Sequence, residues 1–425
     1  MKVGICSLGC KVNLYESEFI ISLLKEKGYT VVDFNEKADI YIINTCSVTN
    51  ESDKKSRKMI HKAKRNNKDA IIIAMGCYIQ ADKEDIEANI LLGNKDKSKI
   101  VAIIEEYLKT KENKKILYDL TKVEFEKMEI TEFTNHTRAF VKIQDGCNAF
   151  CSYCIIPYVR GGIRSKKPED VIDEVTHLVD KGYKEIVLTG IHTGKYGLDI
   201  NASLEELLEA LVKIPGLYRL RLSSIEINEI TPKIIKLLRE NDIMAKHLHI
   251  PLQSGSNKIL KKMNRQYTKE EFLDKIKILK EIPNISLTTD LIVGFPGETE
   301  IEYKETLETL NKIKFTKIHT FPYSPREGTP ASTMAGQVSP EDKKRRVHEI
   351  ISLSNETELS FYKESVNKVF DGVIEIHDYD IVMVHTTNFI PILVEEKIPN
   401  NTIVKVKITK IDNNRVYGQI LEIYK

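Results

Sequence analysis

The feature that most constrains the fold of this chain is a repeated alternation of apolar strand segments and amphipathic helix segments between residues 139 and 325. The strand candidates are AFVKI, EIVLTG, YRLRLSS, KHLHIPL, ISLTTDLIVG and KIHTFPYS. Helix candidates lie between them at residues 168–181, 203–213, 232–240, 269–281 and 300–312. Such alternation is typical of a parallel sheet covered by helices. Six strand–helix units are too few for a closed eight-stranded barrel, so we expect an open, partial (β/α)6 barrel with ligands at the carboxyl ends of its strands.

Different patterns flank this central region. Residues 1–100 also alternate, with VGICSL, ADIYIINT and AIIIAMG as buried parallel strands, which predicts a small doubly wound α/β domain. Residues 101–137 are rich in charge and are expected to form an irregular connection. A long polar helix is expected at 340–363, followed by short strands typical of a small β-barrel. The predicted α/β multidomain chain therefore divides into domains at 1–110, 137–335 and 362–425.

Composition places the chain among ordinary globular proteins, with 41% hydrophobic and 30% charged residues. No apolar run approaches the ~18 residues of a membrane span, and the N-terminal stretch MKVGICSLGCKVN lacks a secretion-signal pattern. We therefore expect a cytoplasmic protein with no membrane contact and with reduced thiols. We also expect a monomer, although neither composition nor motif indicates the oligomeric state. The net charge is only +2, so any binding of nucleic acid must use local patches.

Three cysteines lie close together in VKIQDGCNAFCSYC, directly after the first strand of the expected barrel. We call Cys147, Cys151 and Cys154 the loop triad; they belong to a loop at the carboxyl edge, where a ligand site is expected. A structural zinc site takes four ligands and a ferredoxin cluster takes four thiolates, yet this segment has no fourth cysteine, and His136 precedes the strand. Three thiolates fit a [4Fe–4S] cluster with one iron left open. Zinc and buried structural thiols are the alternatives.

Three further cysteines follow the ends of predicted strands in the N-terminal region, in SLGC, INTC and AMGC. Because parallel strands end on one edge of a sheet, Cys10, Cys46 and Cys77 are expected to converge there, and we call them the strand-end triad. The alternative is scattered buried cysteines, since free cysteine is often buried. Cys6 lies inside the first strand and is expected to be a small core residue.

The spacing CxxxCxxC of the loop triad resembles the radical S-adenosylmethionine signature. Together with SLGCKVNLYESE, NTCSVT, GCYIQ, HIPLQSGS, TTDLIVGFPGET and YSPREGTPA, it makes essentially the whole chain similar to the radical S-adenosylmethionine methylthiotransferases. The resemblance implies two [4Fe–4S] clusters. The cluster on the loop triad would bind S-adenosylmethionine and cleave it to a 5′-deoxyadenosyl radical, with an electron from a donor such as flavodoxin or ferredoxin. The auxiliary cluster on the strand-end triad would carry the sulfur that is methylated and inserted.

The resemblance also implies residues that contact S-adenosylmethionine. An aromatic residue beside the last loop cysteine would pack near the adenine, and strand-end positions would hold the methionine and nucleoside parts. The positions are Tyr153, Thr189, Gly190, Ser224, Glu226, Gln253 and Gly294. Ordinary loop and cap chemistry is the alternative for each of them. His247 and His249 are expected to face the core of the barrel.

Branches of the family differ in substrate: threonylcarbamoyladenosine in tRNA, isopentenyladenosine in tRNA, or an aspartate of a ribosomal protein. CKVNLYESE is most similar to the bacterial threonylcarbamoyladenosine branch, which has Lys after the first cluster cysteine, although Leu14 and Glu327 depart from that branch's pattern. The expected function is addition of a methylthio group at adenine C2 next to the anticodon, giving 2-methylthio-N6-threonylcarbamoyladenosine. The alternatives are the same chemistry on the other two substrates and, in a different class, a non-catalytic RNA-binding protein whose thiols hold zinc.

The expected partner is the anticodon stem-loop of tRNA. The C-terminal strands resemble the RNA-binding TRAM domain, but residues 362–425 hold eight Lys or Arg against nine Asp or Glu, so only a stripe of Lys405, Lys407 and Lys410 is a candidate contact. Residues 51–69 hold eight Lys or Arg against three Asp or Glu. This helix follows one of the strand-end cysteines, and its cations could bind phosphates without reading sequence. The KKRR run at 343–346 is a weaker candidate, and a solvated surface is the alternative for each patch.

Overall fold

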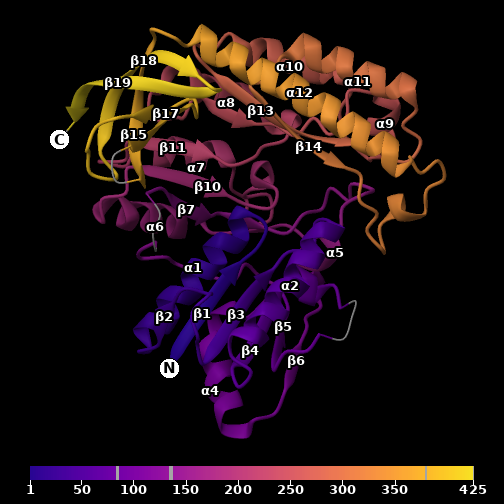
Figure 1. The fold of residues 1–425 in the computed structure, drawn as a ribbon, viewed down its shortest axis with the longest axis vertical. Coiled ribbons are helices and arrows are strands. Elements are labelled where there is room, and N and C mark those ends of the chain that lie inside the picture. The colour runs from indigo at the N-terminus through magenta and orange to yellow at the C-terminus, as the bar shows by residue number, and fades with distance from the viewer. Residues whose placement is uncertain (83–85, 134–136, 379–380, 425) are drawn as a thin grey trace.

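The computed structural model describes residues 1–82, 86–133, 137–378 and 381–424. An N-terminal α/β unit, a central open barrel and a small C-terminal β-barrel follow one another along the chain (Figure 1). This arrangement confirms the fold class predicted from the sequence. Within the described residues, no helix combines the length and apolar character needed to span a bilayer.

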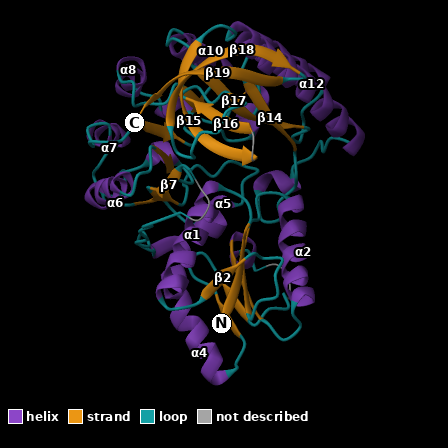
Figure 2. Cartoon of the chain, turned by 60° about the vertical axis from the view of Figure 1, so that its left-hand side comes forward, coloured by secondary structure: helices purple, strands orange, loops and turns teal. Residues whose placement is uncertain are grey.

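The N-terminal unit is built on a parallel sheet in the order β2-β1-β3-β4-β5-β6. Its strands are β1 (Lys2–Ser7), β2 (Thr30–Val32), β3 (Ile40–Thr45), β4 (Ile71–Gly76), β5 (Ile90–Leu92) and β6 (Lys114–Ile116). Its helices are α1 (Lys11–Glu26), α2 (Asn50–Asn66), α3 (Cys77–Gln80) and α4 (Ile100–Thr110). Helices α1 and α4 cover one face and α2 the other, as Figure 2 shows. Since both faces are covered, β3 and β4 are buried along their whole length.

The connection predicted to be irregular at residues 101–137 contains most of α4 and all of β6, so the prediction was wrong for its first part. Ile100, Ile103, Ile104 and Tyr107 form a buried stripe at helical spacing, and charged residues occupy the opposite face. The many charged residues on that outer face made the helical spacing of the apolar residues hard to recognise in the sequence. Strand β6 is only three residues long, too short for a period-two pattern, and it extends the N-terminal sheet beyond residue 110.

The central region has two parallel three-stranded sheets, in the orders β11-β10-β7 and β12-β13-β14, that together form an open half-barrel, as predicted. The strands are β7 (Ala139–Lys142), β10 (Glu185–Thr189), β11 (Arg219–Leu222), β12 (His247–His249), β13 (Ser286–Val293) and β14 (Lys317–Pro322). Leu220 joins the two halves, because its amide donates to the carbonyl of Ile243 at 2.8 Å and it bridges to Met244. The outer helices are α6 (Pro168–Asp180), α7 (Leu204–Leu211), α8 (Pro232–Glu240), α10 (Lys269–Lys280) and α11 (Glu300–Ile313).

Short elements after the strands shape the upper rim of this half-barrel. They are β8 (Gln144–Asp145), α5 (Ile156–Arg160), β9 (Arg164–Ser165) and α9 (Asn257–Lys262). Single 3₁₀ turns at Lys97–Lys99, Leu120–Lys122, Thr193–Lys195, Ile227–Glu229 and Pro330–Thr333 complete the connections. The rim is thus assembled from loops at the carboxyl ends of the strands, where such barrels bind ligands.

The C-terminal part begins with α12 (Pro340–Glu364), the long helix expected from the sequence. The strands that follow are β15 (Val369–Asp378), β16 (Ile381–Thr386), β17 (Pro391–Val394), β18 (Ile403–Asp412) and β19 (Arg415–Tyr424). They close into a barrel in the order β15-β16-β17-β19-β18, which confirms the predicted module. Arg219 of the half-barrel donates to the carbonyls of His385 and Asp371 at 3.0 and 3.1 Å, so the small barrel is docked against the amino ends of the central strands.

Candidate functional site

The strand-end triad lies at the carboxyl edge of the N-terminal sheet. Cys10 caps the start of α1 after β1, Cys46 follows β3, and Cys77 opens α3 after β4. Strands β1 and β3 are neighbours whose following helices cover opposite faces, so the triad surrounds a topological switch point, the usual binding crevice of such sheets. Cys46 and Cys77 are buried, whereas Cys10 is open to the cavity above.

A glycine permits the close approach of Cys10 to Cys46. Gly9 has φ +92°, and a Cβ on it would lie 2.6 Å from both the Cβ and the Sγ of Cys46. Any other residue would therefore push the two cysteine segments apart. Gly76 plays the same part before Cys77, with φ +99° and a hypothetical Cβ 2.7 Å from the carbonyl oxygen of Thr45.

The loop triad occupies the segment between β8 and α5. The amide of Cys154 donates to the carbonyl of Cys151 at 2.9 Å, and the amide of Cys147 donates to the carbonyl of Gly161 at 2.9 Å, so local backbone bonds fold the loop. Burial raises the pKa of the Cys154 thiol to about 12, and the neighbouring thiols add to this rise. Burial likewise raises the pKa of Cys46 in the other triad to about 11. Thiolates in these places therefore need positive charge nearby, such as iron.

Two cationic side chains that the sequence reasoning missed lie against the loop triad. His192 places Nδ1 3.2 Å from Sγ of Cys147 and Nε2 2.6 Å from Oε1 of Glu229. Burial lowers the pKa of His192, but hydrogen bonding to Cys147 and Glu229 outweighs it and raises the pKa to about 10. His192 follows the strand-end pair TG closely enough that its position could have been suspected.

The second missed cation is Arg265, in the segment after α9. Its Nη1 lies 3.5 Å from Sγ of Cys151, and its other amino group forms an ion pair with Glu226. The guanidinium also stacks over the ring of Tyr267 at 5.0 Å. No local pattern marks Arg265, because it reaches the triad from a distant segment of the chain.

The strand-end triad has its own donors on Cys77. Nε of Arg160 and Nδ2 of Asn94 both lie 3.4 Å from Sγ of Cys77. On the other side of Cys77, Ile155 and Val159 of the α5 segment complete its packing. Ile155 immediately follows Cys154 of the loop triad, so the two triads are neighbours across the boundary between the N-terminal unit and the half-barrel.

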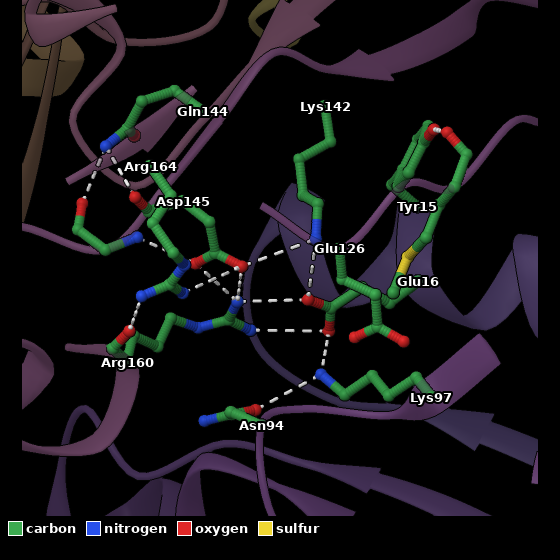
Figure 3. A network of polar contacts seen from close by, with 12 residues as sticks. Tyr15, Glu16, Asn94, Lys97, Glu126, Lys142, Gln144, Asp145, Arg160 and Arg164 are labelled. Carbon is green, nitrogen blue, oxygen red and sulfur yellow. Dashed lines mark hydrogen bonds and ion pairs between the residues drawn. The ribbon is translucent and has the colours of Figure 1, made fainter. Parts of the chain in front are cut away.

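A buried ion network holds this boundary together (Figure 3). Arg160 points between two carboxylates, with Nη1 3.0 Å from Oε1 of Glu16 on α1 and 3.0 Å from Oδ1 of Asp145 before the loop triad. Lys142 reaches both carboxylates at 3.3 Å, and Lys97 pairs with Glu16. Burial raises the pKa of Glu16, but the three cations outweigh it and hold the pKa well below its usual range. One arginine thus connects Cys77 to the segment that leads into Cys147.

The donor chemistry of both triads fits iron–sulfur clusters. Within the described part of the chain, no three His, Cys, Asp or Glu side chains form a group that could hold a single metal ion. A [4Fe–4S] cluster binds each thiolate through a different iron, so its ligands need not converge on one point. Each triad offers three free thiols and an arginine donor. His136, weighed as a fourth zinc ligand, lies outside the described residues.

A cavity of about 850 Å³ fills the interior of the half-barrel and reaches the strand-end triad at Cys10. Alternate residues of the strands line it, because side chains of a strand alternate between its two faces. Three of the predicted contacts of S-adenosylmethionine are among the lining residues, namely Thr189, Gly190 and Ser224.

The other predicted contacts lie around the loop triad and the rim. Tyr153 packs edge-on against Phe295 with ring centres 6.5 Å apart, and Glu226 faces Arg265. Gln253 has φ +63°, and its amide donates to the carbonyl of Asp290 at 2.9 Å. The backbone of Gly294, with φ +71°, approaches the side chain of Lys343, where a Cβ would lie 2.3 Å from Cγ. These four do not line the described cavity.

His247 and His249 were expected to face the core of the barrel, and both side chains do face its interior, where they line the cavity. His249 places Nε2 3.2 Å from Oδ2 of Asp290, and His247 stacks on Phe389 with ring centres 5.0 Å apart. Phe389, from the C-terminal barrel, also lies under the guanidinium of Arg221 at 4.9 Å. The strand pattern shows which way a residue points, but it does not show whether the interior is filled.

Lys11 brings positive charge into this cavity next to Cys10. Enclosure by protein lowers the pKa of its ammonium group to about 8, and the positive charges of Arg138 and Arg221 contribute. Among the described residues, the Lys11 ammonium has no hydrogen-bond or ion-pair partner.

Two family models match the chain. The Radical SAM superfamily model matches residues 141–310, and the model described as Uncharacterized protein family UPF0004 matches residues 2–102. Among solved structures, the radical S-adenosylmethionine methyltransferase TsrM from Kitasatospora setae is similar with a TM-score of 0.57, covering 78% of this chain and 76% of that chain. At 15% identity, this likeness concerns the fold alone.

Curated relatives cover nearly the whole chain. The threonylcarbamoyladenosine tRNA methylthiotransferase MtaB of Bacillus subtilis (strain 168) is 43% identical, covering 99% of this chain and 96% of the relative. The protein of the same name from Aquifex aeolicus (strain VF5) is 39% identical over 88% of this chain and 93% of its own. The tRNA-2-methylthio-N(6)-dimethylallyladenosine synthase of Thermoanaerobacter sp. (strain X514) is 35% identical over 98% and 92%.

Proposed function

Because the chain belongs to the methylthiotransferase family of radical S-adenosylmethionine enzymes, we propose that it adds a methylthio group to C2 of N6-threonylcarbamoyladenosine in tRNA, next to the anticodon. The observation that carries the proposal is the 43% identity over 99% of the chain to the Bacillus subtilis enzyme of that name. The dimethylallyladenosine synthases, at 35% identity, keep the isopentenyl substrate as the second candidate.

The family uses [4Fe–4S] clusters and S-adenosylmethionine, and we assign the radical cluster to the loop triad and the auxiliary cluster to the strand-end triad. The radical cluster, when bound, supplies the electron that cleaves S-adenosylmethionine. The position of the loop triad at the carboxyl edge of the half-barrel supports this assignment. Arg265 and Arg160 would then donate to one cluster sulfur ligand each, and Thr189, Gly190 and Ser224 would contact S-adenosylmethionine in the cavity.

Helix α2 is the best candidate for phosphate contacts with the tRNA. Lys54, Lys58 and Arg65 are exposed on one side of it, and its first turn lies just after Cys46. In the KKRR run, the other basic candidate patch, a cation is already paired within the protein. Arg346 is buried in an ion pair with Glu298 at 2.7 Å. We therefore infer that α2 positions the anticodon stem over the cavity, with the C-terminal barrel as a second contact.

A small reduced carrier such as flavodoxin or ferredoxin is the proposed electron donor, since the reaction consumes electrons that the chain does not store. We further propose that the enzyme acts as a monomer in the cytoplasm, where its tRNA substrate is found.

Mass spectrometry of tRNA nucleosides tests the proposed function. A strain that lacks the gene should lose 2-methylthio-N6-threonylcarbamoyladenosine and accumulate its precursor, and the wild-type gene should restore the product whereas the Cys151→Ala variant should not. If that nucleoside persists and the methylthio derivative of isopentenyladenosine disappears, the second candidate replaces the first.

A further inference from the structure

Among the described residues that line the cavity, Lys11 is the lysine or arginine that has no ion-pair partner. Lys11 opens α1 directly after Cys10, and its side chain lines the cavity. No hydrogen bond or ion pair of its ammonium group is found among the described residues. Lys11 as a whole residue is exposed, so a ligand that enters the cavity can reach its ammonium group without displacing a protein partner.

The other lysine and the two arginines that line the cavity already have acidic partners. Nε of Arg138 lies 2.8 Å from Oε1 of Glu375, Nε of Arg221 lies 2.7 Å from Oε1 of Glu185, and Lys317 pairs with Glu358. The pattern therefore isolates Lys11 as the group available to an anionic ligand.

Glu185 offsets the charge of Lys11 only in part, because this carboxylate is shared. Nη1 of Arg219 lies 3.2 Å from the second oxygen of Glu185, so this one carboxylate serves two guanidinium groups. The positive charges of Arg138 and Arg221, which line the same cavity, also act on the part of it next to Lys11. A ligand that brings a carboxylate into this end of the cavity would meet a favourable field.

The substrates named for the relatives differ in this chemistry. A threonylcarbamoyl group ends in a carboxylate, which is ionised at neutral pH, whereas a dimethylallyl group is a hydrocarbon. We propose that Lys11 binds the carboxylate of the threonylcarbamoyl group and thereby selects this nucleoside over adenosines with apolar N6 substituents. The inference rests on the proposed function and deepens it.

The position of Lys11 supports this role. Cys10 is a proposed ligand of the auxiliary cluster, so the adenine that receives sulfur must approach this residue, and Lys11 is its neighbour in the chain. A lysine has a flexible stem and a compact charge, so it can follow a carboxylate at the end of a rotatable substituent. The guanidinium groups of Arg138 and Arg221 are held in place by their carboxylates and by the ring of Phe389, at 5.4 and 4.9 Å.

The test compares three anticodon stem-loops that differ only at the modified adenosine: threonylcarbamoyl, its carboxamide, and dimethylallyl. Wild-type holoenzyme should show kcat/KM for the first about 10-fold to 100-fold above the other two, as expected for one charge-assisted hydrogen bond. Lys11→Gln should lose this preference by lowering only the value for the threonylcarbamoyl RNA, and Lys11→Arg should restore part of it. Lys317→Gln is the matched control, because it removes a paired cation from the same cavity and should leave the ratio between RNAs unchanged.

Iron content and the electron paramagnetic resonance spectrum of each variant separate substrate selection from damage to the neighbouring cluster. If Lys11→Gln does not assemble both clusters, the wild-type measurement alone tests the proposal. Equal kcat/KM for the threonylcarbamoyl RNA and its carboxamide then overturns the role of Lys11. The same conclusion follows if Lys11→Gln keeps the wild-type ratio. Failure of the wild type to modify the threonylcarbamoyl RNA at all would instead contradict the proposed function.

Discussion

Each cysteine triad is proposed to bind one iron–sulfur cluster, but the chain brings the three thiols together in a different way in each. The loop triad lies within eight residues and is folded by its own backbone hydrogen bonds. The strand-end triad is collected from three strand ends and exists only once the N-terminal sheet has formed. The first site therefore depends on local geometry, and the second depends on the tertiary fold and on docking against the half-barrel.

Their supporting charges differ in the same way. Arg160, beside Cys77, belongs to a deeply buried network in which the side chain of Glu16 is 2% exposed. Arg265, beside Cys151, pairs with Glu226, whose side chain is 24% exposed. The strand-end triad is thus tied to the stability of the whole interface, whereas the loop triad is supported by a pair partly open to water.

Removing one cysteine from each triad should produce the largest effects and should separate the two halves of the reaction. Cys151→Ala should abolish formation of 5′-deoxyadenosine while about four of about eight irons remain. Cys77→Ala should also keep about four irons and should still form 5′-deoxyadenosine, yet give no methylthio product. Iron analysis and product chromatography after anaerobic reconstitution measure both.

Cys6→Ala provides the control for these substitutions, because Cys6 is a partly buried residue packed in the N-terminal core and should leave both clusters intact. Formation of 5′-deoxyadenosine by Cys151→Ala would contradict the assignment of the radical cluster to the loop triad.

Replacement of the two arginines should show the difference in support. Arg160→Met leaves Glu16 and Asp145 with fewer cations in a buried site, so the metal-free chain should lose about 3–5 kcal/mol of unfolding free energy. Arg265→Met should cost less, about 1–3 kcal/mol, because water can reach Glu226. Urea unfolding of both variants gives the comparison.

Redox titration shows whether Arg160 also acts on the cluster. Loss of the donor to Cys77 should make the midpoint potential of the auxiliary cluster more negative, since hydrogen bonds to sulfur stabilise the reduced state. Lys142→Met removes a cation from the same network without touching a sulfur and should shift that potential less. Equal shifts in the two variants would mean that the network acts through charge alone.

The same contrast explains how much of the molecule could be predicted from its sequence. The loop triad has a fixed spacing, and the strand-end triad could be found because each cysteine follows an apolar strand. Arg160 and Arg265 could not be assigned, because burial of a charge depends on partners far away in the chain, such as Glu16 and Glu226. Short strands such as β6 carry too few residues for a pattern, and an empty barrel interior leaves the same alternation as a filled one.

Gly9→Ala should damage the strand-end triad selectively. The added Cβ would lie 2.6 Å from Sγ of Cys46, and the backbone has φ +92°, so strain of about 1–3 kcal/mol adds to the clash. We expect loss of the auxiliary cluster, seen as about half the iron, with the radical cluster retained. Gly28→Ala is the matched control, because Gly28 has φ +81° but nothing within 4 Å of the new Cβ. Equal iron content in the two variants would show that the close approach does not matter.

Acid should weaken the support of the strand-end triad by a smaller amount. The pKa of Glu16 is held below its ordinary value by Arg160, Lys97 and Lys142 despite burial, so its contribution to stability is complete above about pH 4.5 and is lost as the pH falls toward its folded-state pKa. By pH 3 the metal-free wild type should lose about 1–2 kcal/mol more than Glu16→Gln, relative to each protein at pH 7. Urea unfolding at a series of pH values measures this difference. Parallel curves for the two proteins would mean that Glu16 is not the carboxylate that makes the stability of this interface depend on pH. The difference between the buried Arg160 site and the more water-accessible Arg265 site would then rest on geometry alone, without a titratable group.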